Sequence, residues 1–174
     1  ASGERMIVLR DRDSGEEQAL FEDHGSGRIA WSPDGSELVT AEIAELRRVY
    51  SYGDLFRRRV DDPTAERLTE GLRAREPVYS PDGRSVVFVS AREGSTDLLR
   101  LELDSGTLET LYEGEPYEQL YTPAMSPDGT KLALSRYRNE AHRRDLWLFD
   151  LTTRRFEALT DDDALDLEPT FTPD

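Results

Sequence analysis

The sequence predicts an all-β fold, a partial β-propeller built from repeated four-stranded antiparallel sheets that we call blades. One observation is a tetrapeptide, Ser-Pro-Asp-Gly, that occurs three times and begins a fourth time as Thr172-Pro173-Asp174. Its complete copies comprise Ser32, Pro33, Asp34, Gly35, Ser80, Pro81, Asp82, Gly83, Ser126, Pro127, Asp128 and Gly129. The other is the period: successive prolines stand 48, 46 and 46 residues apart. A fixed period of about 20–50 residues indicates a repeat architecture.

The tetrapeptide has the chemistry of a tight turn. Proline presets φ for the second turn position, Asp bonds its local backbone, and Gly accepts a positive φ. An apolar run follows each complete copy, at residues 38–41, 86–89 and 132–134. Because a strand, a tight turn and a second strand form a hairpin, we interpret the motif as a repeated hairpin corner. A repeated ligand site on the Asp residues is the less favoured alternative.

The repeats divide the chain into expected blades. Residues 5–22 contain two apolar runs, 6–9 and 18–21, around the turn Asp13-Ser14-Gly15, and are interpreted as half a blade. Three full blades are expected, followed by the opening strand of another; their ranges are 28–70, 75–113, 120–160 and 168–174. A single blade cannot bury both faces, so neighbours must stack around an axis. We therefore expect a fragment of a ring of about six to eight blades, whose open edges favour a homodimer.

Two loops depart from the template and carry clusters of arginine. One is expected at residues 54–63, after a third strand at 49–52, and the other at residues 137–144. A short helix at 41–49 is the alternative for the region before the first loop. Loops on rigid scaffolds often carry function. The candidate partner-binding residues are therefore Arg57, Arg58, Arg59, Arg143 and Arg144, although pairing with local carboxylates is the competing interpretation.

The composition is strongly acidic, with 37 Asp and Glu, 22 Lys and Arg and a net charge of −15. This charge argues against nucleic acid and anionic membranes as partners. Lys131 is the single lysine among the basic residues, and an acidic, arginine-rich composition suggests a salt-adapted, halophilic source. The absence of cysteine excludes disulfides and Cys-ligated zinc. No apolar run approaches the roughly 18 residues of a membrane span, so no membrane insertion is expected.

The sequence contains no catalytic constellation. It has no Gly-x-Ser-x-Gly elbow, no phosphate-binding loop and no dinucleotide fingerprint, and its two histidines are His24 and His142. Two acidic groups are candidate metal sites: Glu22 and Asp23 with His24, and the run 161–163 with Asp166. Adjacent residues of a strand point to opposite faces, which argues against the first group. A solvated acidic loop is favoured for the second. The sequence therefore predicts no catalytic residue, no metal and no cofactor.

Several short signatures together resemble the WD40-like (PD40) propeller repeat of the TolB family. They are the Ser-Pro-Asp-Gly motif with its preceding aromatic or Met, the strand sequence Asp-Leu-Trp-Leu-Phe-Asp-Leu at 145–151, and the pairs Leu68-Thr69, Leu159-Thr160, Glu76-Pro77 and Glu168-Pro169. The resemblance covers residues 5–174. It implies a non-catalytic scaffold for a protein or peptide partner, in the periplasm or cell envelope. Similar repeats form the substrate-gating propeller of prolyl-oligopeptidase-type serine peptidases, which is the alternative function.

Overall fold

The computed structural model describes residues 5–25, 27–46, 50–139 and 142–173. It confirms the all-β class, because these residues form fourteen strands and no helix. The first sheet is a hairpin of β1 (Met6–Arg10) and β2 (Glu17–Glu22). Three four-stranded sheets follow. The first contains β3 (Ile29–Trp31), β4 (Glu37–Leu46), β5 (Tyr50–Arg59) and β6 (Glu66–Arg67). The second contains β7 (Ala74–Tyr79), β8 (Ser85–Arg92), β9 (Ser95–Glu102) and β10 (Leu108–Tyr112). The third contains β11 (Gln119–Met125), β12 (Lys131–Arg138), β13 (Arg143–Asp150) and β14 (Arg155–Ala158).

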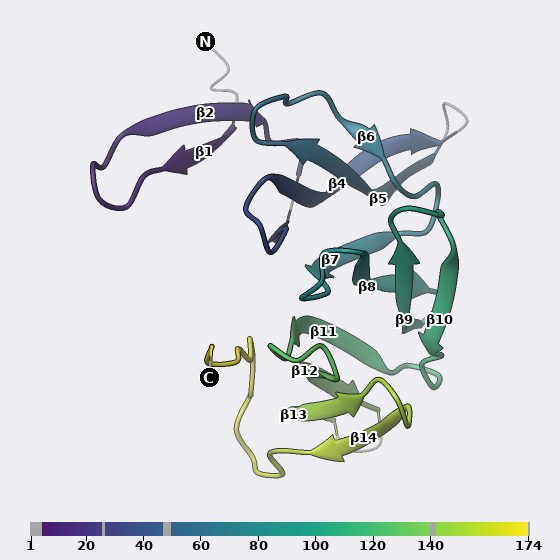
Figure 1. Ribbon diagram of the computed structural model, residues 1–174. Helices are drawn as coiled ribbons and strands as arrows, with labels where there is room; N and C mark the ends of the chain where they lie inside the picture. Colours follow the sequence, from purple (N-terminus) through teal and green to yellow (C-terminus); the bar gives the residue numbers. More distant parts are fainter. Residues whose placement is uncertain (1–4, 26, 47–49, 140–141, 174) are drawn as a thin grey trace.

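Within each sheet the strands pair antiparallel in chain order, which makes every sheet a meander. Figure 1 shows the sheets following one another in an open arc, with the β1–β2 hairpin at one end and the C-terminal segment at the other. The first strand of each four-stranded sheet lies next to the first strand of its neighbour, β3 beside β7 and β7 beside β11. This arrangement is that of a partial propeller, with the first strands on its inner side.

Two apolar layers hold the blades together, and β8 contributes to both. Val86 and Phe88 pack toward the preceding sheet, together with Leu55. Val87 and Val89 pack toward the following sheet. Because successive side chains of a strand point to opposite faces, a strand covered on both faces needs a continuous apolar run. This explains why residues 86–89 are all fully buried.

The Ser-Pro-Asp-Gly segments form the turns between the first and second strands of the sheets. In each turn the Ser hydroxyl donates a 2.6 Å hydrogen bond to the Asp carboxylate, as from Ser126 to Asp128. The Ser hydroxyl also accepts the backbone N–H five residues later, at 2.9–3.0 Å. Gly35, Gly83 and Gly129 have φ of 70–72°, a region that L-residues rarely adopt. The turn geometry thus uses all four residue types of the motif.

The turn carboxylates make the fold sensitive to acid. Hydrogen bonds from Ser32 and Ser126 lower the pKa of Asp34 and Asp128 to about 2, and Ser80 lowers the pKa of Asp82. Since these values lie below the unfolded pKa of about 3.9, ionisation stabilises the fold above about pH 4, and this contribution is lost as pH falls toward 2.

We expect Asp128→Asn to lower the Tm at pH 7 by a few degrees, measured by circular dichroism. The decrease in Tm should be smaller at about pH 2, where the native carboxyl is protonated more often. The control is Asp104→Asn in an exposed turn; a Tm difference for Asp128→Asn that does not shrink with acid would contradict the assignment.

In the first two four-stranded sheets an aspartate of the third strand ties down the connection to the next blade: Asp54, which is fully buried, and Asp97, which is partly buried. The Asp54 carboxylate accepts the backbone N–H groups of Gly71 and Leu72, at 3.0 and 3.3 Å. Asp97 accepts the N–H of Gly114 at 2.9 Å. A connecting segment has no neighbouring strand to accept its backbone N–H groups, so these carboxylates accept them instead. This matters because an unpaired buried N–H is costly in free energy. The sequence interpretation missed this role.

The structure corrects three details of the sequence interpretation. β5 continues through Arg59, so residues 57–59 belong to a strand and not to a loop, because β4 is long enough to pair with all of them. The start of β13 likewise includes Arg143 and Arg144. The described part of the expected last strand, residues 168–173, pairs with no strand. Residues 41–46 belong to β4, as the favoured interpretation expected, and not to the alternative helix. Residues 47–49, including the expected strand start, and Asp174 lie outside the described residues.

Candidate functional site: a groove along the inner strands

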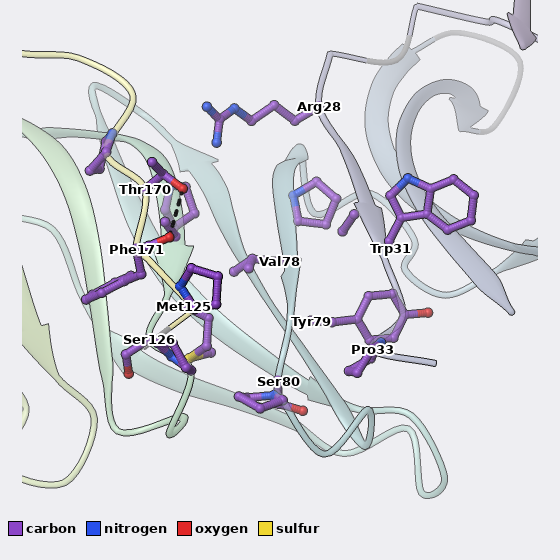
Figure 2. Close-up of a pocket in the computed structure, with 18 of the residues that line it drawn as sticks. Arg28, Trp31, Pro33, Val78, Tyr79, Ser80, Met125, Ser126, Thr170 and Phe171 are labelled. Carbon is purple, nitrogen blue, oxygen red and sulfur yellow. Dashed lines mark hydrogen bonds between the residues drawn. The ribbon is translucent and has the colours of Figure 1, made fainter. Parts of the chain in front are cut away.

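A concavity with a volume of about 500 Å³ runs along the inner side of the arc. β3, β7, β11 and the segment 168–173 all contribute to it. Figure 2 shows Val78 in the middle of this groove, Arg28 extended toward the segment that carries Thr170, and the rings of Trp31 and Tyr79 turned to another side. The groove therefore crosses the three four-stranded sheets and the segment 168–173, and each of them lines it with the same part of its repeat.

Small apolar residues and prolines dominate the wall of the groove. Ala30, Val78, Ala124 and Thr170 occupy the same repeat position, two residues before the Ser or Thr of the turn. Pro77, Pro123 and Pro169 occupy the position just before these. Proline has no N–H to donate, so the wall lacks these donors. Such a wall has room for apolar side chains of an extended chain.

The residue before each of these prolines is strained. Glu76, Thr122 and Glu168 stand 46 residues apart and have φ of 53°, 49° and 54°. Positive φ is unusual for such side chains, and proline restricts the residue before it further. In β7 and β11 the strained residue lies in a β-bulge. The Glu76 carboxylate accepts the N–H of Thr122 at 2.6 Å and so links neighbouring blades. Backbone strain of this kind clusters at functional sites, which supports the groove as the candidate site.

Arg28 occupies the repeat position of these strained residues and brings a positive charge to the groove. It forms no ion pair with any other part of the chain that the structure describes. Glu168 also lines the groove but lies beyond ion-pair distance from Arg28. The groove thus offers one cation and one carboxylate on a wall that mixes apolar residues and prolines with Ser and Thr hydroxyls.

The groove has no arrangement for acid–base or nucleophilic chemistry. The hydroxyls of Ser80 and Ser126 donate to their turn carboxylates and not to a histidine. His24 lies 3.9 Å from Glu22 at the far hairpin, and His142 is exposed on another loop. Among the described residues no group of three or more His, Asp and Glu is placed to hold a metal ion.

All five arginines proposed for partner binding interact with residues of their own chain. Arg57 bonds to Glu66 at 2.7 Å, and Arg59 bonds to Asp61 at 2.9 Å. Arg58 is 7% exposed and pairs with the buried carboxylate of Glu42, while the Phe21 ring lies 4.3 Å from its guanidinium. These three side chains alternate between sheet faces because they lie on one strand.

Arg143 and Arg144 are also engaged. Arg143 lies among acidic groups, 3.3 Å from Asp145 and 3.9 Å from Asp163, and also pairs with Asp161. Its guanidinium therefore pairs with two carboxylates of the run 161–163, the candidate calcium site. Arg144 stacks 3.8 Å from the centre of the Tyr121 ring. The structure brings none of the five arginines into the groove.

A buried polar cluster between the last two blades was missed by sequence reasoning. Glu118 is 2% exposed and accepts hydrogen bonds from the Tyr112 hydroxyl and from Arg136. Arg136 also stacks on Phe156, 4.2 Å from the ring centre. Burial, helped by Glu118, raises the pKa of Tyr112 to about 12. No spacing signal could have found this cluster, because its members come from three separate strands and a loop.

Comparison with known proteins supports the fold and the repeat type. No family model matches the chain. An uncharacterized protein of Agrobacterium fabrum is 28% identical over 166 residues, which are 91% of this chain and 54% of that protein. The Tol-Pal system protein TolB of Anaeromyxobacter dehalogenans is 26% identical over 172 residues, 98% of this chain and 38% of the relative. The chain thus spans about half or less of the length of these relatives.

Solved structures agree with these relatives. TolB from Acinetobacter baumannii superposes with a TM-score of 0.79 at 24% identity, over 97% of this chain and 40% of that one. A putative TolB from Agrobacterium tumefaciens superposes with a TM-score of 0.76 at 25% identity, over 91% of this chain and 57% of that one. Puromycin hydrolase superposes with a TM-score of 0.67 at 17% identity, over 92% of this chain and 26% of that one, so the likeness shows the fold alone. The relatives, the solved structures and the repeated turn motif together identify the chain as a TolB-like β-propeller.

Proposed function

We propose that the chain is a non-catalytic scaffold that binds a protein partner by taking an extended peptide segment of that partner into the inner groove. The observation that carries this proposal is the groove itself. It is a concavity of about 500 Å³, rich in prolines and small apolar residues, that runs across the three four-stranded sheets and the segment 168–173. An extended peptide can follow a groove of this kind, with side chains in alternate depressions and its backbone N–H groups free to meet carbonyls. The described residues that line it carry no catalytic constellation.

The resemblance supports the same class of function. Relatives named TolB match nearly the whole chain, and both of those cited are named as Tol-Pal system proteins. A cell-envelope location is proposed on this resemblance. Among the described residues no helix has the length and apolarity needed to cross a bilayer.

The test begins with a random dodecapeptide library selected on the immobilised chain. Binding of the recovered peptides is then measured by fluorescence anisotropy. Ala124→Arg and Thr170→Arg each place a long cation in the groove, from β11 and from the segment 168–173. We expect each to weaken binding by about tenfold or more, since interface centres carry most of the binding energy. Circular dichroism checks that both variants fold.

Tyr117→Arg is the matched control, because Tyr117 is 65% exposed and lies outside the groove. It should leave peptide binding unchanged. Recovery of no peptide, or of peptides whose affinity is the same for all three variants, would refute the groove as the binding site.

A second candidate function is the substrate-gating propeller of a serine peptidase. The similarity to puromycin hydrolase favours it at the level of fold. In this case the native protein in its source cells should be labelled by a fluorophosphonate probe. Labelling of a chain recognised by an antibody to these residues would support the peptidase-gating function. An unlabelled chain would support the non-catalytic scaffold function.

A further inference from the structure

A separate cavity of about 230 Å³ lies where the second and third four-stranded sheets meet. One wall comes from the connection between β10 and β11, and the other comes from the end of β12 that is remote from its Ser-Pro-Asp-Gly turn. The cavity shares no residue with the inner groove. Its lining residues are Glu115, Pro116, Glu118, Arg136, Arg138 and Asn139. The cavity is therefore a feature of the joint between two complete blades.

Two of the charged residues in this cavity compensate each other. The side chains of Glu118 and Arg136 are 3% and 12% exposed and form an ion pair. The second oxygen of the Glu118 carboxylate accepts the Tyr112 hydroxyl at 2.7 Å and the backbone N–H of Glu115 at 2.8 Å. Because both oxygens of Glu118 are engaged, a ligand of this cavity has to be recognised by the other charged residues.

Those other residues are a cation and a carboxylate that do not pair. Arg138 is partly buried, with its guanidinium carbon 4.8 Å from the centre of the Trp147 ring. The ring holds the guanidinium in place but supplies no oxygen acceptor, and among the described residues Arg138 forms no ion pair. The carboxylate of Glu115 likewise has no ion pair in the part of the chain that the structure describes. The cavity thus presents two opposite charges that are too far apart to compensate each other.

The connection that carries Glu115 is held in a fixed and strained conformation. The N–H of Glu118 donates to the carbonyl of Glu115 at 3.0 Å, which closes a tight turn. Tyr117, the third residue of this turn, has φ of 66°, where glycine is usual. Such strain persists only where the surrounding structure imposes it, and it clusters at functional sites. The hydrogen bond from the Glu115 N–H to the Glu118 carboxylate is part of that support, and a site organised in advance binds its ligand at a lower entropic cost.

We propose that this cavity binds a small α-amino acid. The carboxylate of the ligand accepts N–H groups of Arg138, and its ammonium group donates to the carboxylate of Glu115. Hydrogen bonds between charged groups are stronger than neutral ones. A simple anion would leave Glu115 without a partner, and a simple cation would leave Arg138 without one, so a zwitterion fits this pair of charges best. Because a water molecule occupies about 30 Å³, the cavity has room for about eight non-hydrogen atoms, enough for alanine.

Isothermal titration calorimetry of the intact 174-residue chain with L-alanine tests the proposal. Propionate and ethylamine serve as matched probes, because each keeps the alanine skeleton but lacks one of its two charges. We expect saturable binding of L-alanine. Each of the other two probes should bind at least about tenfold more weakly, since it leaves one charged group of the cavity without a partner.

Substitutions of the two unpaired residues locate the site. Arg138→Gln and Glu115→Gln each remove one charge from the cavity and should weaken L-alanine binding about tenfold or more. The matched controls are Arg84→Gln and Glu70→Gln, which remove the same charges at exposed positions outside the cavity. Both controls should leave the affinity unchanged. Circular dichroism checks that all four variants fold.

Three results would overturn the proposal. The first is the absence of saturable L-alanine binding by the native chain. The second is an equal affinity for propionate, which would make the cavity a site for simple anions. The third is an L-alanine affinity that either Arg138→Gln or Glu115→Gln leaves unchanged. None of these results bears on the inner groove, because the variants that test the groove are at other residues.

Discussion

Replacing Gly114 by alanine should lower the free energy of unfolding by about 3 kcal/mol. A Cβ at this position would overlap the carbonyl oxygen of Thr96, which is a backbone atom. Thr96 cannot yield easily, because it is fully buried and its hydroxyl accepts the N–H of Leu120 at 2.7 Å. Either β9 or the connection to β11 must shift. For a chain of this size we expect a Tm decrease of about 6–12 °C, measured by calorimetry.

Gly27→Ala is the matched control for this substitution. No atom lies within 4 Å of a Cβ built on Gly27, and its φ is not in the positive region. Its effect should stay within about 0.5 kcal/mol. Equal Tm values for the two variants would show that the approach of Gly114 to Thr96 is not a packing constraint.

Asp54→Ala should destabilise the protein by about 4 kcal/mol. The Asp54 side chain is 0% exposed and accepts hydrogen bonds from Arg67 at 2.7 Å and from Thr69 at 3.0 Å, in addition to two backbone N–H groups. Truncation leaves these donors unsatisfied. It also leaves the positive charge of Arg67 without the carboxylate that compensates it. The connection between β6 and β7 should lose its fixed path, which hydrogen exchange at Gly71 would detect.

The control is Asp61→Ala, because Asp61 pairs with Arg59 on the exposed surface. Exposed ion pairs contribute little to stability, so urea unfolding should show little change. If Asp54→Ala unfolded at the same urea concentration as the native chain, the buried carboxylate would not be an anchor between blades.

Part of the candidate site could be predicted from the sequence, because it belongs to the repeat. The pairs Glu76-Pro77 and Glu168-Pro169 were recognised as leads into the next blade, and the structure places both prolines and Glu168 along the groove. The sequence does not show that these equivalent positions converge on one concavity. That convergence depends on how the blades rotate about an axis, which no local pattern specifies.

The five arginines show where local reasoning was insufficient. Their clustering indicated surface loops, yet Arg58 is buried against Glu42, 16 residues away along the chain. Arg144 stacks on Tyr121 from a different strand. A charged residue can lie on a strand when a carboxylate or a ring on a neighbouring strand compensates it. Sequence alone gives the charge but not the partner.

The sequence by itself determined the all-β class, the four-stranded repeat and the positions of its corners, because turn chemistry and alternation act over a few residues. Only the tertiary structure decided which side chains meet between blades: the groove, the Glu118 cluster, the Asp54 anchor and the contact of Gly114 with Thr96. These contacts join residues from separate strands or connections. Their partners are fixed by sheet stacking and register, which local patterns cannot specify.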